Sequence, residues 1–106
     1  MIEARGCEAD LDDAEALQAL LRAAAKAVGA TEHAASTARF VPHGITAILI
    51  LAESHMLITT WPEHRLALID VLLCNDAMEP RDAWAVMKAA LRPADELLQE
   101  VVRTVG

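Results

Sequence analysis

Aromatic and basic residues are both scarce in this chain of 106 residues. It has one Phe, two Trp and no Tyr, and its 9 Lys and Arg face 16 Asp and Glu, for a net charge of −7. Nucleic-acid binding needs clustered positive charge against the phosphates, so we expect no nucleic-acid partner. Two cysteines, Cys7 and Cys74, are too few for the disulfide framework of a small secreted domain.

Long apolar runs are also missing. The longest uninterrupted run is Ala47–Ala52, whereas a helix that crosses a bilayer needs about 20 apolar residues. No stretch with the charged-then-apolar order of a signal segment opens the sequence. We therefore expect a cytoplasmic protein that does not contact a membrane.

Aliphatic side chains, in contrast, are abundant. Hydrophobic residues make up 55% of the sequence, which is ample for one core, and the length predicts a single domain over residues 1–106. A domain of this size buries only about two-thirds of the surface that its unfolded chain exposes, so association is a natural route to stability. We expect a homodimer, because it would cover apolar surface that the core leaves out.

Two amphipathic helices are predicted near the two ends of the chain. The first is expected to start in the acidic run Asp10–Asp13, with negative charge at its positive end, and to stop at Gly29. The second is expected to start at Pro80, where a missing N–H costs nothing, and to end before Pro93. The apolar residues of the first helix recur at spacings of three and four: Leu17, Leu20, Leu21, Ala24 and Val28.

The segments between these helices are rich in β-branched and apolar residues and predict strands. An extended segment over 31–40 is followed by strands at Ile45–Ala52, Met56–Trp61 and Leu66–Cys74. Apolar residues occupy both parities of the last strand, so both faces of the sheet are predicted to be buried. The order helix, strands, helix predicts an α+β fold: a two-layer sandwich in which a mostly antiparallel sheet carries helices on one face.

The middle of the sequence contains four short motifs in order. They are Phe40-Val41-Pro42-His43-Gly44-Ile45-Thr46, Glu53-Ser54-His55, Thr60-Trp61-Pro62-Glu63 and Asp70-Val71-Leu72-Leu73-Cys74. At these spacings the set closely resembles the self-cleaving core of the prokaryotic S-adenosylmethionine decarboxylases. In that family the chain breaks at a Glu-Ser bond, and the serine becomes a pyruvoyl group. The resemblance implies a proenzyme that is cleaved between Glu53 and Ser54 and carries a pyruvoyl cofactor made from Ser54.

The resemblance also implies roles in self-cleavage. The Oγ atom of Ser54 would attack the carbonyl carbon of Glu53, and the hydroxyl of Thr46 would assist this processing. In the mature enzyme, the pyruvoyl carbonyl would form a Schiff base with the α-amino group of the substrate.

The histidines of the chain show no metal-ligand spacing, so we expect no metal ion.

Three further residues would act on the substrate by the same resemblance. Cys74 would protonate the carbon that has lost CO₂, Glu63 would accept hydrogen bonds from the ribose hydroxyls, and Phe40 would stack on the adenine. A cysteine in an apolar strand is also common in a core, and Phe40 is equally compatible with a core position. A serine between two strands, without the motif, would be read as a turn residue.

The sequence departs from the family at Thr59. The family has a histidine five residues after the cleavage serine, and a histidine can take up a proton near neutral pH, whereas a threonine hydroxyl is a poor base. Losing a general base typically costs roughly 10²–10⁴ in rate, so we expect slow or incomplete maturation. His64, one residue after Glu63, is a candidate replacement base.

The secondary structure of residues 94–105 is ambiguous, since their apolar spacing favours a helix while the resemblance implies a strand.

Three functions are compatible with these residues. The first is a pyruvoyl-dependent S-adenosylmethionine decarboxylase, which makes the aminopropyl donor for spermidine and other polyamines. The second is a related decarboxylase of ornithine or arginine, because the electrophile can act on any α-amino acid. The third is an unprocessed, non-catalytic paralogue that serves as a binding or assembly subunit. Thr59 favours the third, whereas Ser54, Thr46, Glu63 and Cys74 favour the first two.

Overall fold

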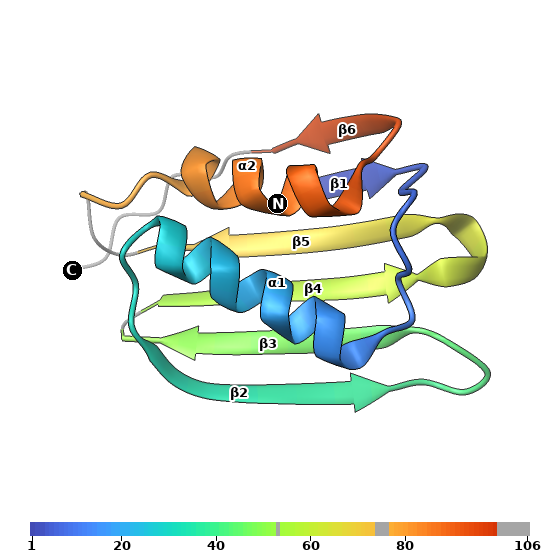
Figure 1. Cartoon of the computed structure of the whole chain (residues 1–106), viewed down its shortest axis with the longest axis horizontal. Coiled ribbons are helices and arrows are strands. Elements are labelled where there is room, and N and C mark those ends of the chain that lie inside the picture. The colour runs from blue at the N-terminus through green and yellow to red at the C-terminus, as the bar shows by residue number, and fades with distance from the viewer. Residues whose placement is uncertain (53, 74–76, 100–106) are drawn as a thin grey trace.

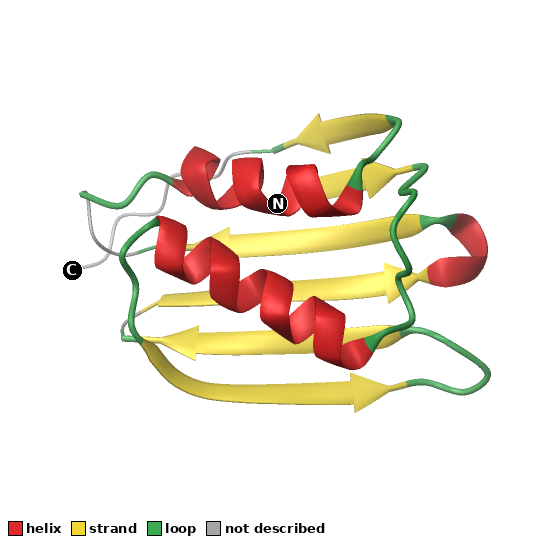
Figure 2. Cartoon of the chain, in the orientation of Figure 1, coloured by secondary structure: helices red, strands yellow, loops and turns green. Residues whose placement is uncertain are grey.

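A six-stranded antiparallel sheet with two helices on one face forms the part of the chain that the structure describes, residues 1–52, 54–73 and 77–99 of a computed structural model (Figure 1). The strand order is β2-β3-β4-β5-β1-β6. Figure 2 shows α1 and α2 side by side over the sheet. The predicted α+β two-layer sandwich is therefore confirmed.

The elements are β1 (Ile2–Arg5), α1 (Ala14–Ala27), β2 (Glu32–Arg39), β3 (Ile45–Leu51), β4 (Ser54–Trp61), the 3₁₀ helix η1 (Pro62–His64), β5 (Leu66–Leu72), α2 (Pro80–Leu91) and β6 (Asp95–Leu98).

Both helices begin as the sequence predicts. The side chain of Asp13 caps α1 by accepting a hydrogen bond from the Ala16 amide at 3.1 Å, and Pro80 occupies the first position of α2. Gly29 follows α1 with φ of 75°, a left-handed conformation that glycine adopts at little cost. Among the described residues, neither helix is long and apolar enough to cross a membrane.

Alternate residues of the strands face the helices and form the core. The buried positions of the three central strands are Ile45, Ala47, Leu49 and Leu51 on β3, Met56 and Ile58 on β4, and Ala67 and Ile69 on β5. They pack with the apolar stripe of α1 and with Trp84, Met87 and Leu91 of α2. Because side chains alternate along a strand, the intervening residues lie on the other side of the sheet.

That opposite side, which we call the open face, is also largely apolar. Over β3, β4 and β5 it consists of Thr46, Ile48, Ile50, His55, Leu57, Thr59, Trp61, Leu66, Leu68, Asp70 and Leu72. No element among the described residues covers it, and Ile50 and Leu72 are exposed. The helix-facing side of β5 is buried as the sequence predicts, whereas burial of the open face stays a prediction that depends on a second copy.

The structure decides two local points that the sequence left open. Ser54 is the first residue of β4 rather than a turn residue, and it pairs with Leu51 across the ladder to β3. At the other end of the chain, Asp95–Leu98 is a strand despite its helical spacing. Pairing with β1 decides this: β6 lies antiparallel to β1, and the Arg5 guanidinium reaches the Asp95 carboxylate at 2.5 Å.

Candidate active site

Thr46 and Thr59 face each other across the β3–β4 ladder. They are paired in the sheet register, both are half-buried on the open face, and their Oγ1 atoms are 3.1 Å apart. One hydroxyl therefore donates to the other, and the accepting hydroxyl keeps its own proton for another contact. The pair can offer one hydrogen bond to a developing negative charge but holds no group that titrates near neutral pH.

Thr60, the next residue along β4, anchors this end of the sheet from the helix side. Its side chain is 2% exposed, and its Oγ1 donates to the Leu11 carbonyl at 2.8 Å and accepts from the Ile45 amide at 3.1 Å. These bonds tie the segment before α1 to the start of β3, beside Thr46. Sequence reasoning matched Thr60 to a motif but assigned it no role.

Phe40 lies at the surface in the connection from β2 to β3. Its amide donates to the Gly44 carbonyl at 2.8 Å, which closes a tight turn. Gly44 has φ of 115°, and a Cβ there would come 3.1 Å from the Thr60 carbonyl oxygen. Phe40 is 52% exposed, so the core position that the sequence left open for it is wrong, and its ring is accessible for stacking.

Glu63 lies beside this turn, in η1 immediately after β4. Its carboxylate contacts the imidazole of His43, which comes from the turn that carries Phe40. The two residues predicted to bind the adenosyl group therefore belong to neighbouring segments. No pattern in the sequence singled out His43.

Ser54 lies at the opposite end of β4 from this cluster. It is buried and shares the helix-facing parity of Met56, Ile58 and Thr60. Thr59 follows it by five residues in the same strand, which at about 3.3 Å per residue separates their backbones by roughly 17 Å. Figure 1 shows β4 running from the left of the sheet, where it starts, to the right, where it ends. Glu53 and Cys74, also predicted site residues, lie outside the described residues.

The chain thus presents two groups of predicted site residues. Phe40, Thr46, Thr59 and Glu63 lie at one end of β3 and β4, and Ser54 lies at the other. His64, the candidate replacement base, is exposed in η1 with Glu63, while His55 lies on the open face opposite Leu72. Across residues 1–52, 54–73 and 77–99, no three His, Cys, Asp or Glu side chains gather closely enough to hold a metal ion.

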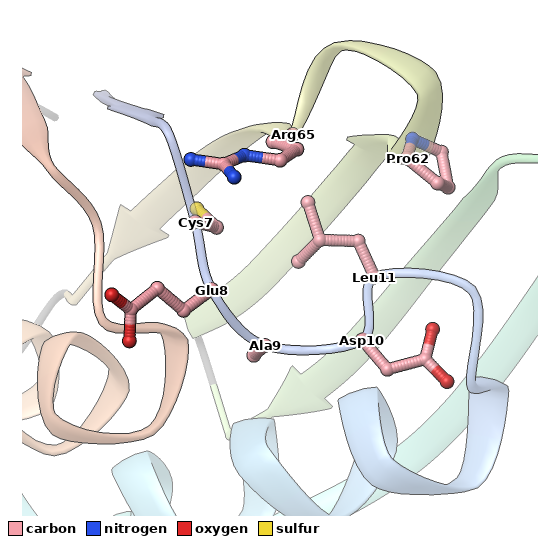
Figure 3. A pocket seen from close by; sticks show the side chains of 7 residues that line it. All are labelled: Cys7, Glu8, Ala9, Asp10, Leu11, Pro62 and Arg65. Atoms are coloured by element: carbon pink, nitrogen blue, oxygen red, sulfur yellow. The ribbon is translucent and has the colours of Figure 1, made fainter.

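A separate cavity of about 340 Å³ opens between the segment before α1 and the turn after β4 (Figure 3). Burial raises the pKa of the Cys7 thiol, and the nearby Arg65 guanidinium opposes this rise only in part. Cys7 therefore resembles a small core residue rather than a reactive thiol. None of the predicted site residues lines this cavity, whose walls are Cys7, Glu8, Ala9, Asp10, Leu11, Pro62 and Arg65.

Comparison with known proteins gives matches over nearly the whole chain. The family model described as S-adenosylmethionine decarboxylase matches residues 1–104. An S-adenosylmethionine decarboxylase proenzyme of Methanococcus maripaludis is 35% identical over 106 residues, covering 99% of this chain and 87% of the relative. The proenzyme of Parasynechococcus marenigrum is 39% identical over 104 residues, covering 97% and 81%.

A solved structure gives the same result for the fold. The crystal structure of the adenosylmethionine decarboxylase from Aquifex aeolicus superposes with a TM-score of 0.82 at 30% identity. The match covers 97% of this chain and 92% of the other.

Proposed function

The chain belongs to the S-adenosylmethionine decarboxylase family of proenzymes, and we propose that it cleaves itself between Glu53 and Ser54 to generate the pyruvoyl group on which this family depends. Its reaction is that of a carboxy-lyase, the release of CO₂ from S-adenosylmethionine, and the family implies a place in spermidine synthesis. The observation that carries the proposal is the match over residues 1–104, within which the Glu53-Ser54-His55 triplet is intact.

Self-cleavage requires only groups of this chain and water. The Oγ atom of Ser54 attacks the carbonyl carbon of Glu53, the peptide nitrogen takes up the proton, and an ester replaces the amide. Loss of the proton on Cα of Ser54 then expels the Glu53 carboxylate and leaves dehydroalanine. Dehydroalanine tautomerises to an imine as a proton moves from nitrogen to the terminal carbon, and water converts the imine to a ketone and releases ammonia. Ser54 is suited to this because it is the first residue of β4, so the break falls at the end of a strand and leaves the ladder in place.

Thr46 and Thr59 are the proposed processing residues. One hydroxyl proton is used in the hydrogen bond between them, and the other can be donated to the oxyanion that forms when Ser54 attacks, a contribution that preorganised donors make in many acyl transfers. Neither hydroxyl is a good base at neutral pH, so removal of the Cα proton is the step that the family's histidine would speed and that Thr59 leaves slow.

We propose that these groups meet in a homodimer. The roughly 17 Å between Ser54 and Thr59 along β4 is too long for a direct contact within one protomer. A second copy packed on the open face would bury its apolar side chains. In an antiparallel arrangement, it would bring the end of β4 that carries Ser54 in one protomer over the end of the sheet that carries Thr46 and Thr59 in the other. The same arrangement would bring Phe40 and Glu63 toward the serine of the partner.

The pyruvoyl group would supply a carbonyl that condenses with the substrate's amino group and withdraws electrons as CO₂ leaves. Phe40 would stack on the adenine, for which its exposed ring is available. Glu63 would accept hydrogen bonds from the ribose hydroxyls, and the Sγ atom of Cys74 would return a proton to the carbon that lost CO₂. We place this chemistry in the cytoplasm, without a metal ion; a free buried thiol such as Cys7 is usual there.

Intact-mass measurement of the purified protein tests the cleavage. We expect the wild type to give two fragments that meet between residues 53 and 54, and the Ser54→Ala variant to remain whole, because alanine lacks the attacking oxygen. Release of CO₂ from labelled S-adenosylmethionine, ornithine and arginine then tests the substrate. Release from ornithine or arginine alone would favour the second interpretation, and an uncleaved wild type that releases none would favour the binding subunit.

A further inference from the structure

The contact between His43 and Glu63 joins two segments that the sequence keeps apart. His43 lies in the turn between β2 and β3, and Glu63 lies in η1 after β4. The imidazole Nε2 meets carboxylate Oε2, and both side chains are partly exposed. Within the described residues, Oε1 of Glu63 has no hydrogen-bond partner. A carboxylate offers about four acceptor sites, so His43 leaves most of this acceptor capacity available.

The turn that carries His43 is itself held in place by Asp12. Asp12 Oδ1 accepts a hydrogen bond from the Gly44 amide at 3.2 Å. On the other side of the turn, the Arg39 guanidinium donates to the Asp12 carbonyl at 3.1 Å and lies 3.7 Å from Asp12 Oδ2. Both ends of the turn are thus tied to the residue that precedes the N-cap of α1. His43 therefore contacts Glu63 from a turn whose position is held by contacts with Asp12.

From this geometry we infer that His43 is a positioning residue, which holds the Glu63 carboxylate in the orientation that receives the ribose of the substrate. The inference rests on the proposed role of Glu63 in binding S-adenosylmethionine. A glutamate side chain free to rotate loses that freedom when it binds, and the loss weakens binding. Because His43 holds Oε2, the Glu63 side chain has already lost much of its rotational freedom before the ligand binds. Its Oε1 atom and remaining lone pairs can then accept hydrogen bonds from the ligand at a smaller entropic cost.

The expected size of the effect follows from the cost of fixing one flexible side chain. That cost corresponds to roughly a 3- to 10-fold change in dissociation constant. It should appear only for ligands with ribose hydroxyls, because Glu63 has nothing to accept from a ligand that lacks them. It should also vanish when Glu63 is absent, because His43 acts through that carboxylate.

The experiment measures the binding of adenosine and of 2′,3′-dideoxyadenosine by titration calorimetry. The full-length chain carries Ser54→Ala in every sample, so that differences in maturation cannot affect the result. We expect His43→Ala to weaken adenosine binding roughly 3- to 10-fold and to leave dideoxyadenosine binding unchanged. His43→Gln, whose amide can donate to Glu63, should recover most of the loss. His33→Ala, which changes an exposed histidine on β2, is the matched control and should have no effect.

A double-mutant cycle with Glu63→Ala separates positioning from a general structural role. His43→Ala should cause no further loss of adenosine binding in the Glu63→Ala background. A full additional loss there, an equal loss for both nucleosides, or unchanged adenosine binding by His43→Ala would overturn the inference. If the parent protein fails to bind adenosine, the adenosyl role of Glu63 is wrong and the inference falls with it, whereas the cleavage proposal is judged separately by mass.

Discussion

Replacing Thr60 by valine should destabilise the protein far more than the loss of one surface hydroxyl would. Valine has nearly the same shape as threonine but cannot hydrogen-bond. The Thr60 hydroxyl joins the Leu11 carbonyl at 2.8 Å and the Ile45 amide at 3.1 Å. All three residues are buried, with Ile45 at 0% and Leu11 at 3% exposure, so water cannot easily replace the missing partner.

The magnitude follows from two backbone groups left unsatisfied. Each buried donor or acceptor that loses its partner costs about 1–3 kcal/mol. The methyl group that replaces the hydroxyl recovers part of this by apolar burial, so we expect a net loss of about 2–4 kcal/mol in the free energy of unfolding. In a domain of this size 1 kcal/mol shifts Tm by roughly 4–8 °C. The expected fall in Tm is therefore roughly 8–32 °C.

Thermal unfolding followed by circular dichroism measures this fall, with wild type and variant at the same protein concentration because association would also shift Tm. Thr60→Ser is the matched control, since it keeps the hydroxyl and loses only a methyl group. We expect Thr60→Ser to be clearly more stable than Thr60→Val. If valine is tolerated within about 0.5 kcal/mol, or if serine is the worse of the two, the hydrogen bonds of Thr60 do not stabilise this end of the sheet.

Three further predictions concern processing, assembly and pH. Thr59→His should speed self-cleavage, roughly 10-fold or more, in a mass-spectrometric time course; an unchanged rate would show that the missing base is not limiting. Leu57→Glu, which places a charge at the centre of the open face, should convert a dimer to a monomer in light scattering, and a wild type that is already monomeric at micromolar concentration would refute the proposed interface. Burial raises the pKa of the Cys7 thiol in the folded protein. The stability that comes from keeping this thiol protonated is fully present below the pKa of an unfolded cysteine, about 8.5. It is lost as pH rises through the higher pKa of the folded state. Chemical denaturation across this range should accordingly show a smaller alkaline decline for Cys7→Ala than for wild type.

The sequence predicted the architecture because its apolar spacing is consistent over long segments. The stripe of α1, the proline that opens α2 and the two-sided apolar pattern of β5 each indicate one element, and all three agree with the structure. Where the spacing of apolar residues favoured a helix, pairing with a neighbouring strand determined the structure instead. Leu97 and Leu98 sit at helical spacing with later residues, yet β6 forms because β1 offers it a partner.

The arrangement of the site was less accessible from sequence. The motifs identified Phe40, Thr46, Ser54, Thr59 and Glu63, but their separation into two groups depends on the length and direction of β4. Contacts between distant segments leave no local pattern. Thr60 finds its acceptor 49 residues away, at Leu11, and His43 meets Glu63 only because the β2–β3 turn folds beside η1. The roles of these five residues remain predictions for the experiments above.

The strand order also determines what becomes of the two fragments after the proposed cut. The first fragment would supply β1, α1, β2 and β3, and the second β4, β5, α2 and β6. Neither keeps a contiguous sheet, because β1 lies between β5 and β6 of the other fragment. Pulling the fragments apart would mean opening the β3–β4, β1–β5 and β1–β6 ladders and the packing of α1 on α2. The two would therefore behave as an interlocked pair that dilution does not separate, and once denatured they would have to find each other by a bimolecular encounter. When folding comes before scission, the sheet assembles within a single molecule and no such encounter is needed.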